Sequence, residues 1–69
     1  MSAVIKFKDT KVVDSKPLAL RIEIPTRRGV VTAWIPKSVI HDDSEVYAAN
    51  TDGDLIIARW FAEKEGIEP

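Results

Sequence analysis

The sequence predicts a mainly β domain of the α+β type: a small five-stranded antiparallel barrel, SH3-like or OB-like, with one short central helical turn and a short C-terminal helix. Apolar and polar residues alternate along several short segments, which is the period of half-buried strands. Turn-forming residues separate these segments at regular intervals, as in small barrels. The 69 residues suffice for one domain, residues 1–69, with a thin core.

The first half of the chain predicts two or three strands. Residues 3–8 alternate, and residues 12–13 either continue this strand or begin another. Alternation is clearest in residues 18–24, and Pro25 is expected to end that strand because proline cannot donate to a ladder. Residues 30–35 are β-branched and aromatic and return as the second arm of a hairpin. The residues of 18–24 expected on the inner face are Leu18, Leu20, Ile22 and Ile24.

The second half predicts a helical turn, a second hairpin and the helix. Residues 36–40 begin with proline, which the first turn of a helix tolerates. Strands at 45–49 and 54–58 flank an Asp-Gly pair, which is a hairpin signal. The helix is expected at 58–66 with Gly66 at its C-terminus and Ile67 folding back over the last turn. On its buried face we expect Ile57, Trp60, Phe61 and Ile67.

The composition excludes several kinds of site. The chain has no cysteine and one histidine, so disulfides and thiolate metal sites are excluded, and self-association is the remaining way to support a small core. No apolar run reaches the ~20 residues of a membrane span, and the first residues do not form a signal peptide. We therefore expect a cytoplasmic protein with no membrane partner.

No catalytic or cofactor site is expected. Ser38, His41 and Asp42 or Asp43 are the residue types of a hydrolase triad, but they lie within six positions of one another, whereas real triads join distant segments, and no nucleophile elbow is present. Residues 41–45 lack the ligand spacing of a metal site, and residues 50–54 lack the closing glutamate of a calcium loop. With three glycines the chain holds no phosphate-binding loop. We expect no enzyme, no cofactor and no small-molecule substrate.

Charge is divided between the two halves of the chain. Residues 1–37 carry eight basic and three acidic residues, a net charge of +5, and residues 38–69 carry two basic and eight acidic residues, a net charge of −6. Either the fold interleaves the halves and neutralises them, or it presents a basic and an acidic face. The basic face, for nucleic acid or a protein partner, would hold Lys6, Lys8, Arg21, Arg27, Arg28, Trp34 and Lys37. The acidic face, for a protein partner, would hold Asp42, Asp43, Glu45, Asp52, Asp54, Glu63 and Glu65.

The aromatic residues have two interpretations. Trp34, Trp60 and Phe61 could form the core, because a small domain needs large side chains to bury enough area. Alternatively, Trp34 could be a stacking platform for nucleic acid beside basic side chains. If Ala33 and Ile35 face inward, Trp34 faces outward.

Two segments carry a family resemblance. Residues 34–40 (Trp-Ile-Pro-Lys-Ser-Val-Ile) and 59–67 (Arg-Trp-Phe-Ala-Glu-Lys-Glu-Gly-Ile) resemble the W-[IL]-P-x-S-x-[IV] block and the W-[LF]-A-x-x-x-G-[LI] helix of small proteins encoded by bacteriophages and prophages. The match covers roughly residues 18–67 and implies accessory work in DNA metabolism or host takeover. A shorter likeness, Val-Thr at 31–32 and Ile-Pro-Lys at 35–37, is to swapped-hairpin transcription factors that contact DNA as dimers.

Two functions follow from these observations. The first is a non-catalytic phage-type accessory protein that binds a host protein and inhibits a host defence or nucleic-acid-processing factor. The alternative is a small β-barrel that binds single-stranded DNA or RNA or acts as a DNA-binding regulator.

Overall fold

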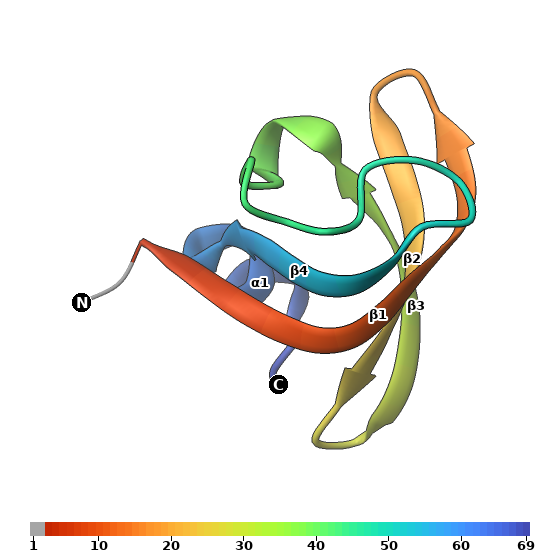
Figure 1. Cartoon of the computed structure of the whole chain (residues 1–69). Helices are drawn as coiled ribbons and strands as arrows, with labels where there is room; N and C mark the ends of the chain where they lie inside the picture. Colours follow the sequence, from red (N-terminus) through yellow and green to blue (C-terminus); the bar gives the residue numbers. More distant parts are fainter. Residues whose placement is uncertain (1–2) are drawn as a thin grey trace.

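A computed structural model describes residues 3–69 as one four-stranded antiparallel sheet in the order β3-β2-β1-β4, followed by a short C-terminal helix (Figure 1). The elements are β1 (Val4–Lys16), β2 (Ala19–Thr26), β3 (Gly29–Pro36), the 3₁₀ helix η1 (Lys37–Val39), β4 (Asp52–Ala58) and α1 (Arg59–Glu65). The mainly β class, the helical turn after β3 and the C-terminal helix are as predicted. The sheet is open and has four strands in the described residues, so the five-stranded closed barrel is not formed.

Strand β1 is continuous and sharply bent. Its first half, from Val4 to Lys11, pairs with β4, and its second half, from Lys11 onward, pairs with β2. The register shifts between Phe7 and Thr10, where Asp9 has a φ of 59°. A bulge of this kind bends a strand and increases its twist. The turn-forming residues at 9–11 therefore bend the strand without ending it, and β4 runs crosswise to the β2–β3 hairpin (Figure 1).

The β2–β3 hairpin extends beyond the predicted stop at Pro25. Arg27 and Arg28 form the two-residue turn, and Pro25 pairs with Val30 inside the ladder. The pairing of β1 with β2 ends at Glu23, so among residues 3–69 no strand lies on the side of Pro25 away from β3, where an N–H would be needed.

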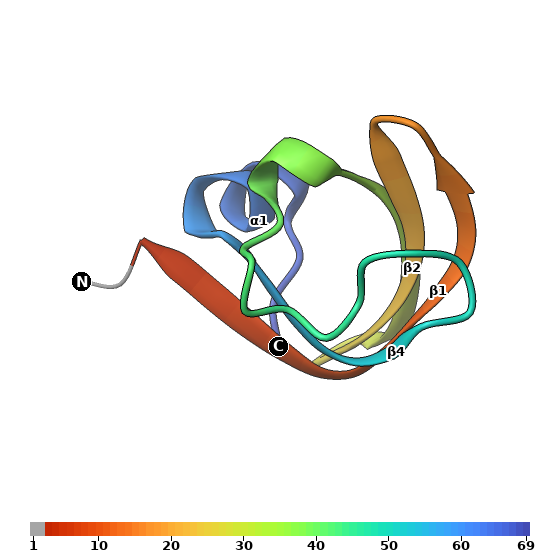
Figure 2. The same ribbon diagram turned by 45° about the horizontal axis from the view of Figure 1, so that its top comes forward.

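The core lies on the concave face of the sheet, which curls around it (Figure 2). Leu18 was expected there but is 82% exposed, because it belongs to the turn between β1 and β2. The buried apolar side chains are Phe7, Val12, Leu20, Ile22, Ile24, Ile35, Val46, Leu55, Ile57, Phe61, Ala62 and Ile67.

Residues 41–51 form a loop where a strand at 45–49 was predicted. The loop nevertheless follows the outer edge of β4. The backbone N–H of Glu45 donates to the Asp54 carbonyl (2.8 Å), and the Ser44 hydroxyl both accepts from the Ile56 N–H (2.8 Å) and donates to the Ile56 carbonyl (3.0 Å). Side chains thus satisfy the strand edge in place of a regular ladder, since buried backbone groups require partners. The predicted Asp-Gly turn lies inside β4, with Gly53 opposite Thr10.

Helix α1 ends as predicted. Gly66 has a left-handed φ of 71°, and the Ile67 N–H donates to the Ala62 carbonyl at 2.9 Å, which brings Ile67 into the core. Trp60 differs from its prediction because it is 60% exposed, and Phe61 and Ala62 form the buried face.

Candidate functional site

An aromatic side chain lies beside two cationic residues on the convex face of the sheet. Trp34 of β3 is directly across from Arg21 of β2. The ammonium nitrogen of Lys16, at the end of β1, is 4.7 Å from the centre of the Trp34 ring, a cation–π contact. Trp34 is 37% exposed while its neighbour Ile35 is fully buried, so the outward parity predicted for Trp34 is what the structure has. We call Lys16, Arg21 and Trp34 the outer-face cluster.

The predicted basic residues are divided among several places. Arg21 and Trp34 come together, and Lys37 is exposed directly after β3. Arg27 and Arg28 form the opposite end of the hairpin, five residue pairs from Trp34, which is about 17 Å along a strand. Lys16 was missing from the predicted set. Its signal would have been the pairing of β1 with β2, which places residues near position 16 beside the start of β2.

Near the bend of β1, positive and negative side chains alternate. The Lys6 ammonium lies 3.1 Å from the Asp54 carboxylate. Lys11 is cross-strand to Asp52 on one side and to Glu23 on the other. Beside the outer-face cluster, Asp14 lies across from its member Arg21. The two charge sets therefore mix around β1, and Lys6 does not add to a continuous basic face with Arg21. Lys8 is exposed at the bulge.

The predicted acidic residues also serve several purposes. A Glu45 carboxylate oxygen accepts from the Asp54 N–H at 2.8 Å, so Glu45 ties the loop to β4. Asp43 lies 3.6 Å from the His41 ring nitrogen Nδ1. The remaining members are exposed except Asp54, which is half-buried: Asp42 in the loop, Asp52 at the start of β4, and Glu63 and Glu65 on α1.

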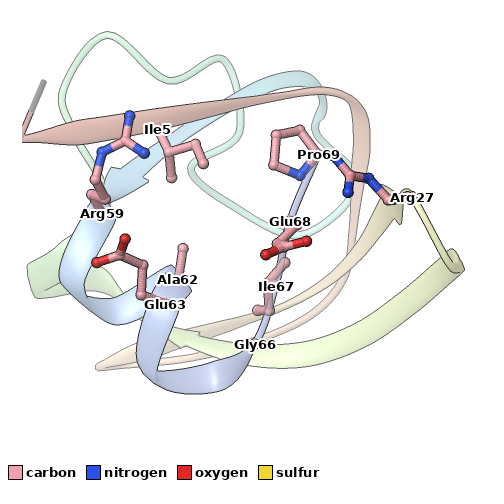
Figure 3. Close-up of a pocket in the computed structure, with 9 residues that line it drawn as sticks. All are labelled: Ile5, Arg27, Arg59, Ala62, Glu63, Gly66, Ile67, Glu68 and Pro69. Carbon is pink, nitrogen blue, oxygen red and sulfur yellow. The ribbon is translucent and has the colours of Figure 1, made fainter. Parts of the chain in front are cut away.

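A pocket lies on another side of the molecule, between α1, the C-terminal residues and the hairpin tip (Figure 3). It is open and has a volume of about 410 Å³. Its charged lining combines Arg27 and Arg59 with Glu63 and Glu68, so it offers no net charge to a polyanion. The other lining residues are Ile5, Ala62, Gly66, Ile67 and Pro69.

The loop residues considered for chemistry do not form a preorganised group. Ser38, His41 and Asp42 line one shallow pocket, but among residues 3–69 no hydrogen bond joins Ser38 to His41. The His41 ring nitrogen Nδ1 instead accepts from the Asp43 backbone N–H at 3.1 Å. The described residues contain no cluster of three or more metal-ligating side chains.

Comparisons with known proteins add no further constraint. No family model, curated protein or solved structure matches the chain. Within residues 3–69, no helix has the length and apolar character needed to cross a membrane.

Proposed function

We propose that this protein is a non-catalytic binding module that takes a single strand of DNA or RNA on the convex face of its sheet. The observation that carries the proposal is the outer-face cluster, a partly exposed Trp34 with the ammonium group of Lys16 over its ring and Arg21 as its cross-strand neighbour. Single-strand binding surfaces combine these elements, because every base has a face that stacks on an aromatic ring and phosphates pair with nearby cations.

The interaction energies favour replacement of the Lys16 ammonium group by a nucleic-acid base on the Trp34 ring. A cation–π contact at an exposed site contributes about 0.5–1 kcal/mol. Stacking of a base on an aromatic side chain contributes about 1–3 kcal/mol. Lys16 is exposed, so its flexible side chain can leave the ring and contact the phosphate of the stacked nucleotide. Lys16 then has two roles: it covers the Trp34 ring in the unbound protein and contacts a phosphate in the complex.

Substitution Trp34→Ala should weaken binding of a fluorescent oligonucleotide about 5- to 150-fold, the equivalent of the stacking energy. Fluorescence anisotropy measures the dissociation constant directly. Trp60→Ala is the matched control, because Trp60 is the other tryptophan, is 60% exposed, and lies on α1 away from the outer-face cluster. The Trp60→Ala variant should bind the oligonucleotide with an affinity within about twofold of the wild type.

The same titration at several salt concentrations tests the cationic part of the site. Each phosphate contact to a single strand contributes about −0.7 to the slope of log affinity against log salt. The double substitution K16Q/R21Q should therefore reduce the slope by about 1.4. An affinity that is unaffected by Trp34→Ala, or a slope unchanged in K16Q/R21Q, would contradict the proposal.

A second candidate is the phage-type accessory protein that binds a host protein. The observation that favours it is Tyr47, which is 71% exposed in the loop that also presents Asp42 and Asp43. Tyrosine is enriched at interface hot spots, and acidic side chains around it speed association with a basic partner. In this function the loop would occupy a basic groove of a host defence or nucleic-acid-processing factor.

Affinity purification from a bacterial lysate, with and without nuclease, separates the two candidates. A stoichiometric protein partner that survives nuclease treatment and is lost with Tyr47→Ala would support the second candidate. Tyr47→Phe serves as the control for loss of the hydroxyl alone. Recovery that disappears on nuclease treatment would count against a direct protein partner.

A further inference from the structure

The two edges of the sheet differ in how they are covered. Along β4, residues 40–45 follow the edge through an isolated bridge between Ile40 and Ile57 and the bonds of Ser44 and Glu45 described above. Strand β3 is the opposite edge, and within residues 3–69 no other segment pairs with its outer side. The eight residues of β3 therefore pair with β2 on one side and leave their outer side open for pairing with another strand.

Strand β3 also lacks the usual protection of an exposed edge. Soluble proteins place charged residues, bulges or proline on such strands to prevent pairing with other chains. Residues 29–36 contain no charged residue, and their one proline, Pro36, is the last. The β2–β3 ladder has no register shift, and Val30, Val31 and Trp34 are all exposed.

The turn geometry determines which groups point to the open edge. In a hairpin with a two-residue turn, the closing pair, here Thr26 and Gly29, is hydrogen-bonded, and the pairs alternate from there. Residues 31, 33 and 35 thus point their N–H and C=O groups toward β2. Val30, Thr32 and Trp34 point theirs outward.

We infer that this edge binds a second copy of the chain, with the two β3 strands antiparallel and related by a two-fold axis at Thr32. The outward-facing set is self-complementary in this register: Val30 lies opposite Trp34 of the second copy, and Thr32 lies opposite Thr32. Aromatic–β-branched and Thr–Thr pairs are both favourable across strands. Arg28 lies opposite Pro36 of the second copy, and no like charges meet within β3 itself because residues 29–36 carry none.

A second copy fits this edge because the two-fold axis at Thr32 brings each Val30 opposite a Trp34, and both copies contribute the same uncharged strand. Association also suits a 69-residue chain without cysteine, whose core alone gives limited stability. The dimer would be one continuous eight-stranded sheet with both Trp34 rings on the same face. The inference stands whether or not that face binds nucleic acid.

The test is the molar mass of the full chain by sedimentation equilibrium, without nucleic acid. The wild type should approach twice 7.7 kDa as its concentration rises. Thr32→Lys and Thr32→Glu, each placing like charges face to face at the axis, should both sediment at 7.7 kDa. An equimolar mixture of the two variants should recover the dimer. Ser38→Lys, which adds the same charge in η1, should leave the wild-type mass unchanged.

Hydrogen exchange gives an independent readout without any substitution. The amides of Val30, Thr32 and Trp34 should become protected as protein concentration rises, while an exposed amide outside the edge, such as that of Asp42, should not. A wild type that stays monomeric at millimolar concentration would overturn the inference. So would a dimeric Thr32→Lys, or folded monomeric variants whose mixture does not associate.

Discussion

Replacing Phe7 by alanine should remove about 3–5 kcal/mol from the free energy of unfolding. Phe7 is fully buried on the concave face, in the half of β1 that pairs with β4, and its cross-strand partner Leu55 is also fully buried. Truncation removes the transfer free energy of the ring and leaves a cavity that the bent strand cannot fill without breaking its pairing. At ~0.05–0.15 kcal/mol per residue, a chain of this size has a total stability of about 3–10 kcal/mol. Phe7→Ala should therefore leave a large part of the population unfolded at room temperature.

Urea denaturation followed by tryptophan fluorescence measures this change as a lower midpoint at an unchanged slope. Tyr47→Ala is the control, since it also truncates an aromatic ring, but at a site that is 71% exposed. Substitutions at such surface sites usually stay within about 0.5 kcal/mol of the wild type. Equal effects of the two substitutions would mean that Phe7 does not lie in the core as described.

The alternation of apolar and polar residues predicted best the strands whose two faces differ most in burial. In residues 20–24 the side chains alternate between the core face and the convex face, so the period of two locates β2 and, through the hairpin, the outward direction of Trp34. The C-terminus of α1 could also be predicted from the sequence, because a left-handed glycine followed by an apolar residue is a local signal. The exposure of Trp60 could not be predicted in this way. Its helix is too short for the helical period to show which of the adjacent residues 60 and 61 faces the core.

The strand predicted at 45–49 shows where local patterns fail. Val46 is buried as a strand residue would be, but the loop meets β4 through the Ser44 hydroxyl and the Glu45 carboxylate. Such side-chain substitutes for a ladder depend on which segments become neighbours, which alternation does not report. The division of charge along the chain has the same weakness. It says nothing of the pairing of β1 with β4, which brings Lys6 to Asp54 and mixes the two sets.

Gly53→Ala should destabilise the protein by several kcal/mol, although the residue lies in a regular strand. Gly53 has a φ of 125°, which L-residues rarely adopt, and this strain costs about 1–3 kcal/mol. An added Cβ would also lie 2.7 Å from a carboxylate oxygen of Glu45 and 3.0 Å from the Glu45 Cβ. Glu45 would have to move and release the Asp54 N–H, at a cost of about 1–3 kcal/mol.

Gly29→Ala separates these two costs. Gly29 has a similar φ of 115°, but an added Cβ there would meet no atom within 4 Å, so this substitution should cost the strain alone. In a Glu45→Ala background only the 3.0 Å contact with the Cβ of residue 45 remains, so the cost of Gly53→Ala should fall toward that of Gly29→Ala without reaching it. The drop in cost is the coupling energy of the double-mutant cycle. Equal costs of Gly53→Ala with and without Glu45 would show that the carboxylate does not hold the loop against β4. Without coupling, Glu45 would be one of the exposed acidic residues that are free to contact a partner. Strong coupling would mean instead that Glu45 closes the β4 edge of the sheet.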